Sequence, residues 1–370
     1  MTQLRTVQVL GGGSAASSAH VRSLAAGLVA RGVRVSVCAP DSLERIYDFR
    51  GCGADHVPVA RRGDPVSLGA LRAACAGADV VHAHGLHAAV RAAVALGGQR
   101  VPLVVTWHTR VYADGPRGHL LRLLERRAVR AAAVVFGASS ELVDRARRRG
   151  ARDARLATVA VPAPRRPAPA FGDDAVHDED GKARAELGAV GRPLLMAVGS
   201  LVPDRGHGTL LDAARAWRGL DPVPLLVIAG EGRERAVLQG RIDDEGLPVS
   251  LVGRRDDVTE LLAAADIALL PSRWEARSPL AQEALRLGVP LVATAVGALP
   301  ELVGEAAELI PYGDATALAD TVTRLLADPD RRAELAAAGR VRAATWPTED
   351  DTIAHVLSVY DELTQPSPLR

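Results

Sequence analysis

The chain repeats one pattern from end to end: a short, uninterrupted apolar run is followed by a longer stretch of helix-forming residues. The apolar runs are rich in valine, leucine and alanine and do not alternate with polar residues, so strands formed from them are apolar on both faces. Such strands must be covered by helices on both sides, which is typical of parallel sheets. The pattern therefore predicts an α/β protein with doubly wound, Rossmann-like parallel sheets. The expected strands are Val7–Leu10, Val33–Ala39, Asp55–Pro58, Val80–Ala83, Leu103–Trp107, Val134–Phe136, Leu156–Val159, Leu194–Gly199, Leu225–Ala229, Val249–Val252, Ile267–Leu270, Leu291–Ala293 and Ala307–Ile310.

The chain is long enough for two domains, and its composition changes near the middle. With 370 residues it exceeds the usual size of one domain. Residues 161–181 are rich in proline and aspartate and poor in apolar side chains, which is typical of a linker. We therefore predict a first domain over residues 1–163, a linker over 164–190 and a second domain over 191–349, with the two sheets facing each other across a cleft.

Composition narrows the classes of function. The three cysteines, Cys38, Cys52 and Cys75, have neither disulfide nor metal-site spacing, which fits a reducing compartment. The first residues enter a strand at once and lack the layout of a signal peptide, and no apolar run approaches the roughly 20 residues that cross a bilayer. Aromatic residues make up 3% of the chain, too few for a platform that stacks single-stranded nucleic acid. These features predict a cytoplasmic protein that does not bind nucleic acid.

The net charge of +1 hides an asymmetry between the two halves. Residues 1–170 contain 25 arginines and 11 acidic residues, and residues 171–370 contain the compensating acidic excess. The basic half could contact an anionic membrane surface or an anionic acceptor; alternatively, the two halves attract each other. Arg122, Arg126, Arg127 and Arg130 recur at helical spacing. This fits either a helix lying on the inner face of a membrane or a solvated basic face.

Two carboxylates flank the start of a predicted helix in the second half. Glu275 and Glu283 lie between two buried runs, and Ser278 and Pro279 suit the N-cap and the first helical position. A helix N-terminus at the edge of a sheet favours an anion, because its free N–H groups and its dipole both attract negative charge. Carboxylates beside such a site are suited to accept hydrogen bonds from sugar hydroxyls. The combination points to a nucleotide-sugar.

Each half begins with a strand that runs into a glycine-bearing loop. Gly11, Gly12 and Gly13 follow the first strand, and Gly199 follows the first strand of the second half. In open α/β sheets, ligands bind at the carboxyl ends of the strands, where these loops lie. The loops lack the dinucleotide fingerprint and the P-loop pattern, which argues against a dehydrogenase and a kinase.

Three histidines close together in the sequence, His82, His84 and His87, raise the question of a metal site. No carboxylate or cysteine beside them completes a ligand shell, so we predict no metal. His84 or His87 could instead line a cleft. His20, near the start of the first predicted helix, is either an ordinary helix residue or a contact to an acceptor.

Several motifs, in order, resemble the GT-B glycosyltransferases of the retaining, family-4 type. They are Val198-Gly-Ser-Leu-Val-Pro-Asp-Arg-Gly, Ile228-Ala-Gly-Glu-Gly-Arg, Trp274-Glu275, Glu283-Ala-Leu, Gly288-Val-Pro-Leu-Val-Ala-Thr and Val296-Gly-Ala-Leu-Pro-Glu-Leu-Val. The resemblance covers nearly the whole chain and is looser in the first half. It implies that the first domain binds the acceptor and the second a nucleotide-sugar. It also implies that a helix at about 350–370 packs back on the first domain.

The resemblance implies roles for individual residues. Glu283 matches a ligand of the donor ribose, and Glu275 matches a contact to the transferred sugar. Arg205 matches the basic residue that clamps the diphosphate, a role that suits the bidentate guanidinium. His108 matches a histidine that points at the sugar and the acceptor. Further positions that match the donor-binding loops are Gly12, Gly13, Gly199, Ser200 and Arg254.

The chain departs from the family pattern at Ser200, where an arginine is usual. Losing one of two cations at the diphosphate could cost about 2–4 kcal/mol of leaving-group stabilisation. Arg277 or Arg233 could replace it.

Taken with its motifs, the chain is expected to be a metal-independent, retaining transferase that needs no cofactor. It would move a sugar from a nucleoside-diphosphate-sugar to an unidentified acceptor, which could be a glycan, a lipid-linked molecule or a small molecule. One alternative is a weakened homologue that binds the nucleotide-sugar or a protein partner without efficient transfer. Another is a nucleotide-sugar epimerase on the same scaffold.

Overall fold

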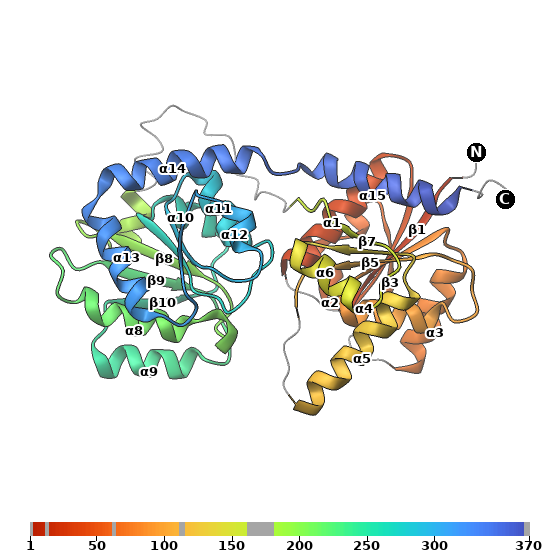
Figure 1. The fold of residues 1–370 in the computed structure, drawn as a ribbon, viewed down its shortest axis with the longest axis horizontal. Helices are drawn as coiled ribbons and strands as arrows, with labels where there is room; N and C mark the ends of the chain where they lie inside the picture. Colours follow the sequence, from red (N-terminus) through yellow and green to blue (C-terminus); the bar gives the residue numbers. More distant parts are fainter. Residues whose placement is uncertain (1–2, 12–14, 61–63, 111–114, 161–180, 366–370) are drawn as a thin grey trace. The chain divides into compact units, whose positions relative to one another are not determined.

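The computed structural model describes residues 3–11, 15–60, 64–110, 115–160 and 181–365 (Figure 1). The chain divides into two compact units, which we call the first unit (Met1–Pro162 with Pro347–Arg370) and the second unit (Ala163–Trp346). Each unit is built around a parallel sheet with helices on both faces. The predicted fold class, two doubly wound α/β domains, is therefore confirmed.

The sheet of the first unit has the strand order β3-β2-β1-β4-β5-β6-β7, and all neighbouring strands are parallel. The chain leaves β1 toward β2 on one side and returns to β4 on the other side, so β1 and β4 form the switch point of this sheet. The strands are β1 (Arg5–Leu10), β2 (Arg34–Ala39), β3 (Asp55–Pro58), β4 (Val80–His84), β5 (Leu103–Trp107), β6 (Val134–Gly137) and β7 (Ala154–Leu156). The helices are α1 (Ala15–Ala30), α2 (Asp41–Tyr47), η1 (Arg50–Cys52), α3 (Pro65–Ala76), α4 (Leu86–Ala95), α5 (Gly115–Ala131) and α6 (Ser140–Arg148).

The last helix, α15 (Glu349–Thr364), packs on α1 and so belongs to the first unit. The side chain of Ile353 fills the space that a Cβ atom at Gly27 would occupy, so the two helices approach closely at this glycine. The helix begins with a capping box. Near its end, Glu362 accepts from Arg155 at 2.8 Å. Helix α15 is thus held to the first unit by Ile353 near its start and by Glu362 near its end.

The sheet of the second unit has the strand order β10-β9-β8-β11-β12-β13, again with parallel neighbours. Two separate clusters of buried apolar side chains pack against its strands. The strands are β8 (Leu194–Val198), β9 (Leu225–Ala229), β10 (Val249–Gly253), β11 (Ile267–Leu270), β12 (Leu291–Thr294) and β13 (Glu308–Ile310). The helices are η2 (Pro203–Arg205), α8 (His207–Trp217), α9 (Arg235–Glu245), α10 (Val258–Ala263), α11 (Pro279–Leu287), α12 (Leu299–Val303), α13 (Ala315–Ala327) and α14 (Pro329–Ala344).

Residues 181–190 correct the predicted linker. Within this range, residues 181–187 form a helix. Ala183 and Leu187 pack against the core of the second unit, and Ala189 is fully buried there. The guanidinium of Arg184 also donates to Asp266 at 2.6 Å. Residues 164–180 of the predicted linker lie outside the described residues.

Among the described helices of both units, none has the length and the apolar content that crossing a membrane requires.

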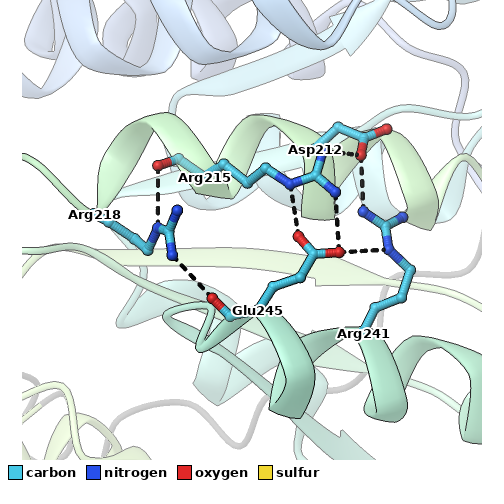
Figure 2. A network of polar contacts seen from close by, with 5 residues as sticks. All are labelled: Asp212, Arg215, Arg218, Arg241 and Glu245. Atoms are coloured by element: carbon cyan, nitrogen blue, oxygen red, sulfur yellow. Dashed lines mark hydrogen bonds and ion pairs between the residues drawn. The ribbon is translucent and has the colours of Figure 1, made fainter.

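Helices α8 and α9 of the second unit are joined by a network of ion pairs, which Figure 2 shows. Glu245, the last residue of α9, accepts from Arg215 of α8 at 2.6 and 2.9 Å and from Arg241 at 3.1 Å. Asp212 accepts from the same two arginines at 2.8 Å, and Arg218 donates to the backbone carbonyl of Glu245. The hydrogen bonds from Arg215 and then Arg241 lower the pKa of Glu245 to about 2. Charges that share several partners stabilise a surface more than an isolated pair does.

The network makes a pH-dependent contribution to stability that the substitution Glu245→Gln should remove. A carboxylate whose folded-state pKa is depressed stabilises the folded state above its ordinary pKa, near 4.5, and loses that effect as the pH falls toward about 2. We expect Glu245→Gln to lower the thermal unfolding temperature at pH 7 and to approach the wild type as the pH is lowered through this window. Asp244→Asn, an exposed carboxylate on the same helix, is the control. A difference that stayed constant down to pH 2 would contradict this account.

Candidate functional site

The two central strands of the second sheet end beside each other and open the candidate site. The chain leaves β8 toward β9 on one side and returns to β11 on the other side, so β8 and β11 form a topological switch point. At such a point the loops after the two strands diverge and leave a crevice at the carboxyl edge of the sheet. The loops after β8 and β11 carry Arg205 and Glu275, two of the residues predicted from the sequence.

Close backbone contacts hold these two loops together. The N–H of Arg273 in the loop after β11 donates to the carbonyl of Asp204 in the loop after β8, at 2.9 Å. Gly206 has φ +72°, and a Cβ atom there would collide with the carbonyl of Pro271. A Cβ atom at Gly230, which follows β9, would collide with the carbonyl of Gly199. Only glycine allows this close approach, so the glycines fix the geometry of the edge.

The side chains of Arg205 and Glu275 form an ion pair across the switch point. The Glu275 side chain is almost completely buried, since the residue is 7% exposed, whereas Arg205 is partly open to solvent. Burial raises the pKa of Glu275, although the charge of Arg205 acts in the opposite direction. The backbone carbonyl of Glu275 also accepts from the N–H of Ala298, at 2.8 Å. Glu275 is therefore a fixed acceptor, and Arg205 keeps donors for a second anion.

Glu283 lies on α11, and the start of this helix is formed as the sequence predicts. The hydroxyl of Ser278 caps the helix by accepting from the N–H of Ala281, and Pro279 occupies the first turn. Glu283 follows in the second turn, with its side chain 13% exposed and 3.7 Å from Arg286. Burial is the main cause that raises the pKa of Glu283, and Arg286 counteracts it. The arrangement leaves a recessed carboxylate beside a helix N-terminus.

Ser200 and Arg254 lie at the same edge of the second sheet, after β8 and β10. Ser200 is exposed, and its carbonyl accepts from the ring of the buried His207 at 3.3 Å. The Arg254 side chain is 77% exposed and lies 3.8 Å from Asp256. Gly199 donates its N–H to the carbonyl of Ala229, which aligns the loops after β8 and β9.

Arg277 is placed differently from the expectation that it replaces the cation missing at Ser200. Burial lowers the pKa of its guanidinium, and the charged groups that act on it are Glu301, Arg342 and Arg286. Its Nε atom is buried without a hydrogen-bond partner. Within the described residues, no hydrogen bond or ion pair joins Arg277 to Ser200. Of these charged groups, Glu301 lies on α12, Arg342 on α14 and Arg286 on α11, and none of them lies in the loop after β8.

The central strands of the first unit carry a row of buried polar side chains. Gln8 on β1, His82 on β4 and Thr106 on β5 are each 2% exposed or less. The ring of His82 contacts Thr106 Oγ1 through Nε2 and Tyr360 Oη through Nδ1, both at 2.7 Å. The Gln8 amide donates to Tyr360 Oη at 2.9 Å. Tyr360 is fully buried and comes from α15, so the last helix completes the polar core of the first sheet.

This row of side chains leads to His108 at the carboxyl end of β5. His84 contacts Gln8 Oε1 through Nε2 at 3.0 Å and His108 Nε2 through Nδ1 at 3.3 Å. His108 is partly exposed, whereas His84 is buried. Burial holds the pKa of His108 well below its usual value, with further contributions from His20 and His82. The same cause, burial, keeps the pKa of His84 low. Both lowered pKa values favour the neutral form of the ring.

The histidines that cluster in the structure are not the three that lie close together in the sequence. His87 is exposed on α4 and does not join His82 and His84. Instead, ligand atoms of His20, His84 and His108 lie within 4.8 Å of one another. Two of these atoms, on His84 and His108, already share a hydrogen bond, which explains the pair without an ion. The predicted positions Gly12 and Gly13 lie outside the described residues.

Gln8 and Tyr360 were not predicted from the sequence to belong to the row of polar side chains that leads to His108. A signal existed for Gln8, because it interrupts an apolar run, and a polar group buried in a strand requires a hydrogen-bond partner. Tyr360 is 352 residues away from its partner Gln8. No local pattern could connect the two.

Two known protein families together match most of the chain. Residues 179–342 match the family described as "Glycosyl transferases group 1". Residues 16–162 match the family described as "Glycosyl transferase 4-like domain". The first match lies within the second unit and the other within the first unit.

Individual relatives are also glycosyltransferases. The chain is 32% identical over 258 residues to the alpha-D-kanosaminyltransferase of Streptomyces kanamyceticus, covering 64% of each protein. It is 34% identical over 168 residues to a GDP-mannose-dependent monoacylated alpha-(1-6)-phosphatidylinositol monomannoside mannosyltransferase of Corynebacterium glutamicum, covering 42% of this chain and 44% of the relative. The alignments thus span 44% to 64% of the length of these curated relatives.

Among solved structures, the chain is similar to HepE of Anabaena in complex with UDP-glucose. The TM-score is 0.80 at 19% sequence identity, and the match covers 97% of this chain and 100% of HepE. At this identity the similarity shows the fold, which is GT-B.

Proposed function

The chain belongs to the group 1 glycosyltransferases and has the GT-B fold, and from this premise we propose that it transfers a sugar from a nucleoside-diphosphate-sugar donor to an acceptor hydroxyl. The proposal includes retention at the anomeric carbon and no essential metal ion. The observation that carries it is the Arg205–Glu275 pair, which joins residues 70 positions apart at the switch point of the second sheet. A cation and a recessed carboxylate side by side suit a diphosphate and the hydroxyls of the sugar attached to it.

In this proposal the second unit binds the donor. Glu283 accepts hydrogen bonds from the ribose hydroxyls, and Glu275 accepts them from the transferred sugar. Gly199, Ser200 and Arg254 contribute the loops around the nucleotide. The positive end of the α11 dipole adds a partial charge beside the diphosphate.

Arg205 is proposed to stabilise the leaving diphosphate. Its guanidinium has five N–H donors, so it can keep Glu275 on one side and bind phosphate oxygens on the other. The cation then stabilises the negative charge that develops as the glycosidic bond breaks. A fixed cation of this kind supplies the stabilisation that a metal ion provides in other transferases. The role of His108 is to contact the sugar or the acceptor from the first unit as a neutral imidazole.

Donor binding can be tested by thermal shift with UDP-, GDP-, ADP- and TDP-sugars. We expect at least one of them to raise the unfolding temperature of the wild type. Glu283→Ala should weaken the binding of that nucleotide-sugar by roughly tenfold to a hundredfold, because each hydrogen bond to a charged acceptor contributes about 1.5–3 kcal/mol. Glu305→Ala, which removes an exposed carboxylate of the same unit, should leave the shift unchanged. Stabilisation of Glu283→Ala equal to that of the wild type would refute the ribose assignment.

The turnover number kcat should rise when a second cation is introduced at position 200. Ser200 is exposed in the loop after β8, where a guanidinium could reach the diphosphate. We expect Ser200→Arg to raise kcat by about tenfold or more, because a charged phosphate contact is worth about 2–4 kcal/mol. Ser358→Arg adds the same charge to an exposed position on α15 and should not change kcat. An unchanged or lower kcat in Ser200→Arg would show that the loop does not contact the leaving group.

We further propose that α5 lies on an anionic membrane, where a lipid-linked acceptor could be reached. Leu123, Arg126, Arg127 and Arg130 form one stripe along this helix, and they line a hollow of about 600 Å³ next to α4. Leu123 is 60% exposed, as is Leu120 at 58%. The amino-terminal part of α5 extends beyond the rest of the first unit (Figure 1). Exposed leucines beside arginines are typical of helices that bind at the surface of anionic membranes.

Vesicle sedimentation tests this contact. The protein should bind vesicles that contain phosphatidylglycerol more tightly than vesicles of phosphatidylcholine alone. Arg126→Glu with Arg130→Glu should weaken binding by about tenfold or more, since each basic residue near the surface contributes about 1 kcal/mol. Arg148→Glu, on the exposed side of α6, is the control. Equal binding by the double variant and the control would exclude α5 as the contact.

A further inference from the structure

The hydrogen bonds of the first unit form one continuous chain from Thr106 to His108. Its order is Thr106, His82, Tyr360, Gln8, His84 and His108, with successive contacts of 2.7, 2.7, 2.9, 3.0 and 3.3 Å. All members except His108 are buried. The chain begins in the core of the sheet and ends at the partly exposed carboxyl end of β5. It therefore connects α15 to a predicted site residue within the first unit.

The direction of every bond in this chain follows from the orientation of one amide. The nitrogen of Gln8 donates to Tyr360, so its oxygen accepts from Nε2–H of His84. His84 then has a lone pair on Nδ1 and must accept from Nε2–H of His108. On the other side, the Tyr360 hydroxyl has accepted from Gln8 and donates to Nδ1 of His82, which leaves Nε2–H of His82 to donate to Thr106. All three histidines carry their proton on Nε2.

We propose that Tyr360 and Gln8 are positioning residues that set the tautomer of His108. With its proton on Nε2, the neutral His108 ring presents the Nδ1 lone pair and can accept a hydrogen bond from a hydroxyl of the sugar or the acceptor. If the Gln8 amide turned over, its nitrogen would donate to His84, and the order of protons would reverse as far as His108. Nδ1 of His108 would then carry the proton and could no longer accept. Tyr360 opposes this reversal, because its hydroxyl would then have to donate to the Gln8 oxygen instead of to His82, so that His82 and Thr106 would have to reverse as well.

The effect on sugar transfer rests on the proposed function, but the tautomer of His108 can be tested without measuring activity. Long-range nitrogen–proton NMR spectra distinguish the two tautomers of each ring. In the folded wild type at neutral pH, we expect His82, His84 and His108 to be neutral with the proton on Nε2. A charged His108, or one protonated on Nδ1, would overturn the proposal even if no sugar transfer were ever detected.

Two variants test the role of the chain. Tyr360→Phe keeps the ring in the core but frees the Gln8 amide to turn, so we expect His84 and His108 to lose their single tautomer. Ile353→Val removes a buried methyl group from α15 at its contact with Gly27 of α1 and should leave every tautomer unchanged. Loss of the single tautomer in Ile353→Val as well would point to a merely structural effect and would overturn the proposal.

The consequence for transfer has a separate readout. Tyr360→Phe should lower kcat with the donor KM unchanged, because the donor is proposed to bind the second unit. Retention of the wild-type tautomer in folded Tyr360→Phe would refute the positioning role. An altered tautomer with an unchanged kcat would refute its part in transfer.

Discussion

Burial of both faces of each sheet is the constraint on which the rest of this structure depends. Helices cover the strands on both sides, so a polar side chain within a strand reaches neither water nor ligand. Polar and charged groups can approach a ligand only where the strands end, and parallel strands all end at the same edge. The ion pair in the second unit and His108 in the first unit both lie just beyond a carboxyl end of a central strand.

The same constraint explains why the polar row in the first unit is so completely connected. Gln8, His82 and Thr106 lie inside the sheet, where each unpaired polar atom would cost about 1–3 kcal/mol. One buried residue cannot satisfy both nitrogens of an imidazole, so each histidine needs a neighbour on either side. Tyr360 supplies a hydroxyl that bonds to both Gln8 and His82. The helix at the end of the chain is therefore part of the polar core of the first unit as well as a cover for α1.

Much of the fold could be predicted from the sequence, because uninterrupted apolar runs leave few alternatives to buried parallel strands. The runs locate the strands of both sheets, and Ser278 with Pro279 marks the start of α11. The boundary of the linker could not be predicted, although half of residues 181–190 are apolar, because the packing of Ala183 and Leu187 on the core depends on residues far away in the sequence. The site, too, could be predicted from the sequence only in part. A motif can indicate Arg205 and Glu275 separately, but their pairing depends on the contact of Gly206 with Pro271.

That contact also determines what the ion pair can do. A buried carboxylate is costly unless a cation is held against it, and Arg205 is the cation that acts on Glu275. Arg205 comes from a loop whose path is fixed by the absence of a Cβ atom at Gly206, so the pair is preorganised before any ligand arrives. Preorganisation matters for a leaving group, because a cation that must first move into place spends part of its interaction energy on that movement. The glycines at the edge of the second sheet thus act on the chemistry through the backbone, although they have no side chain to touch a ligand.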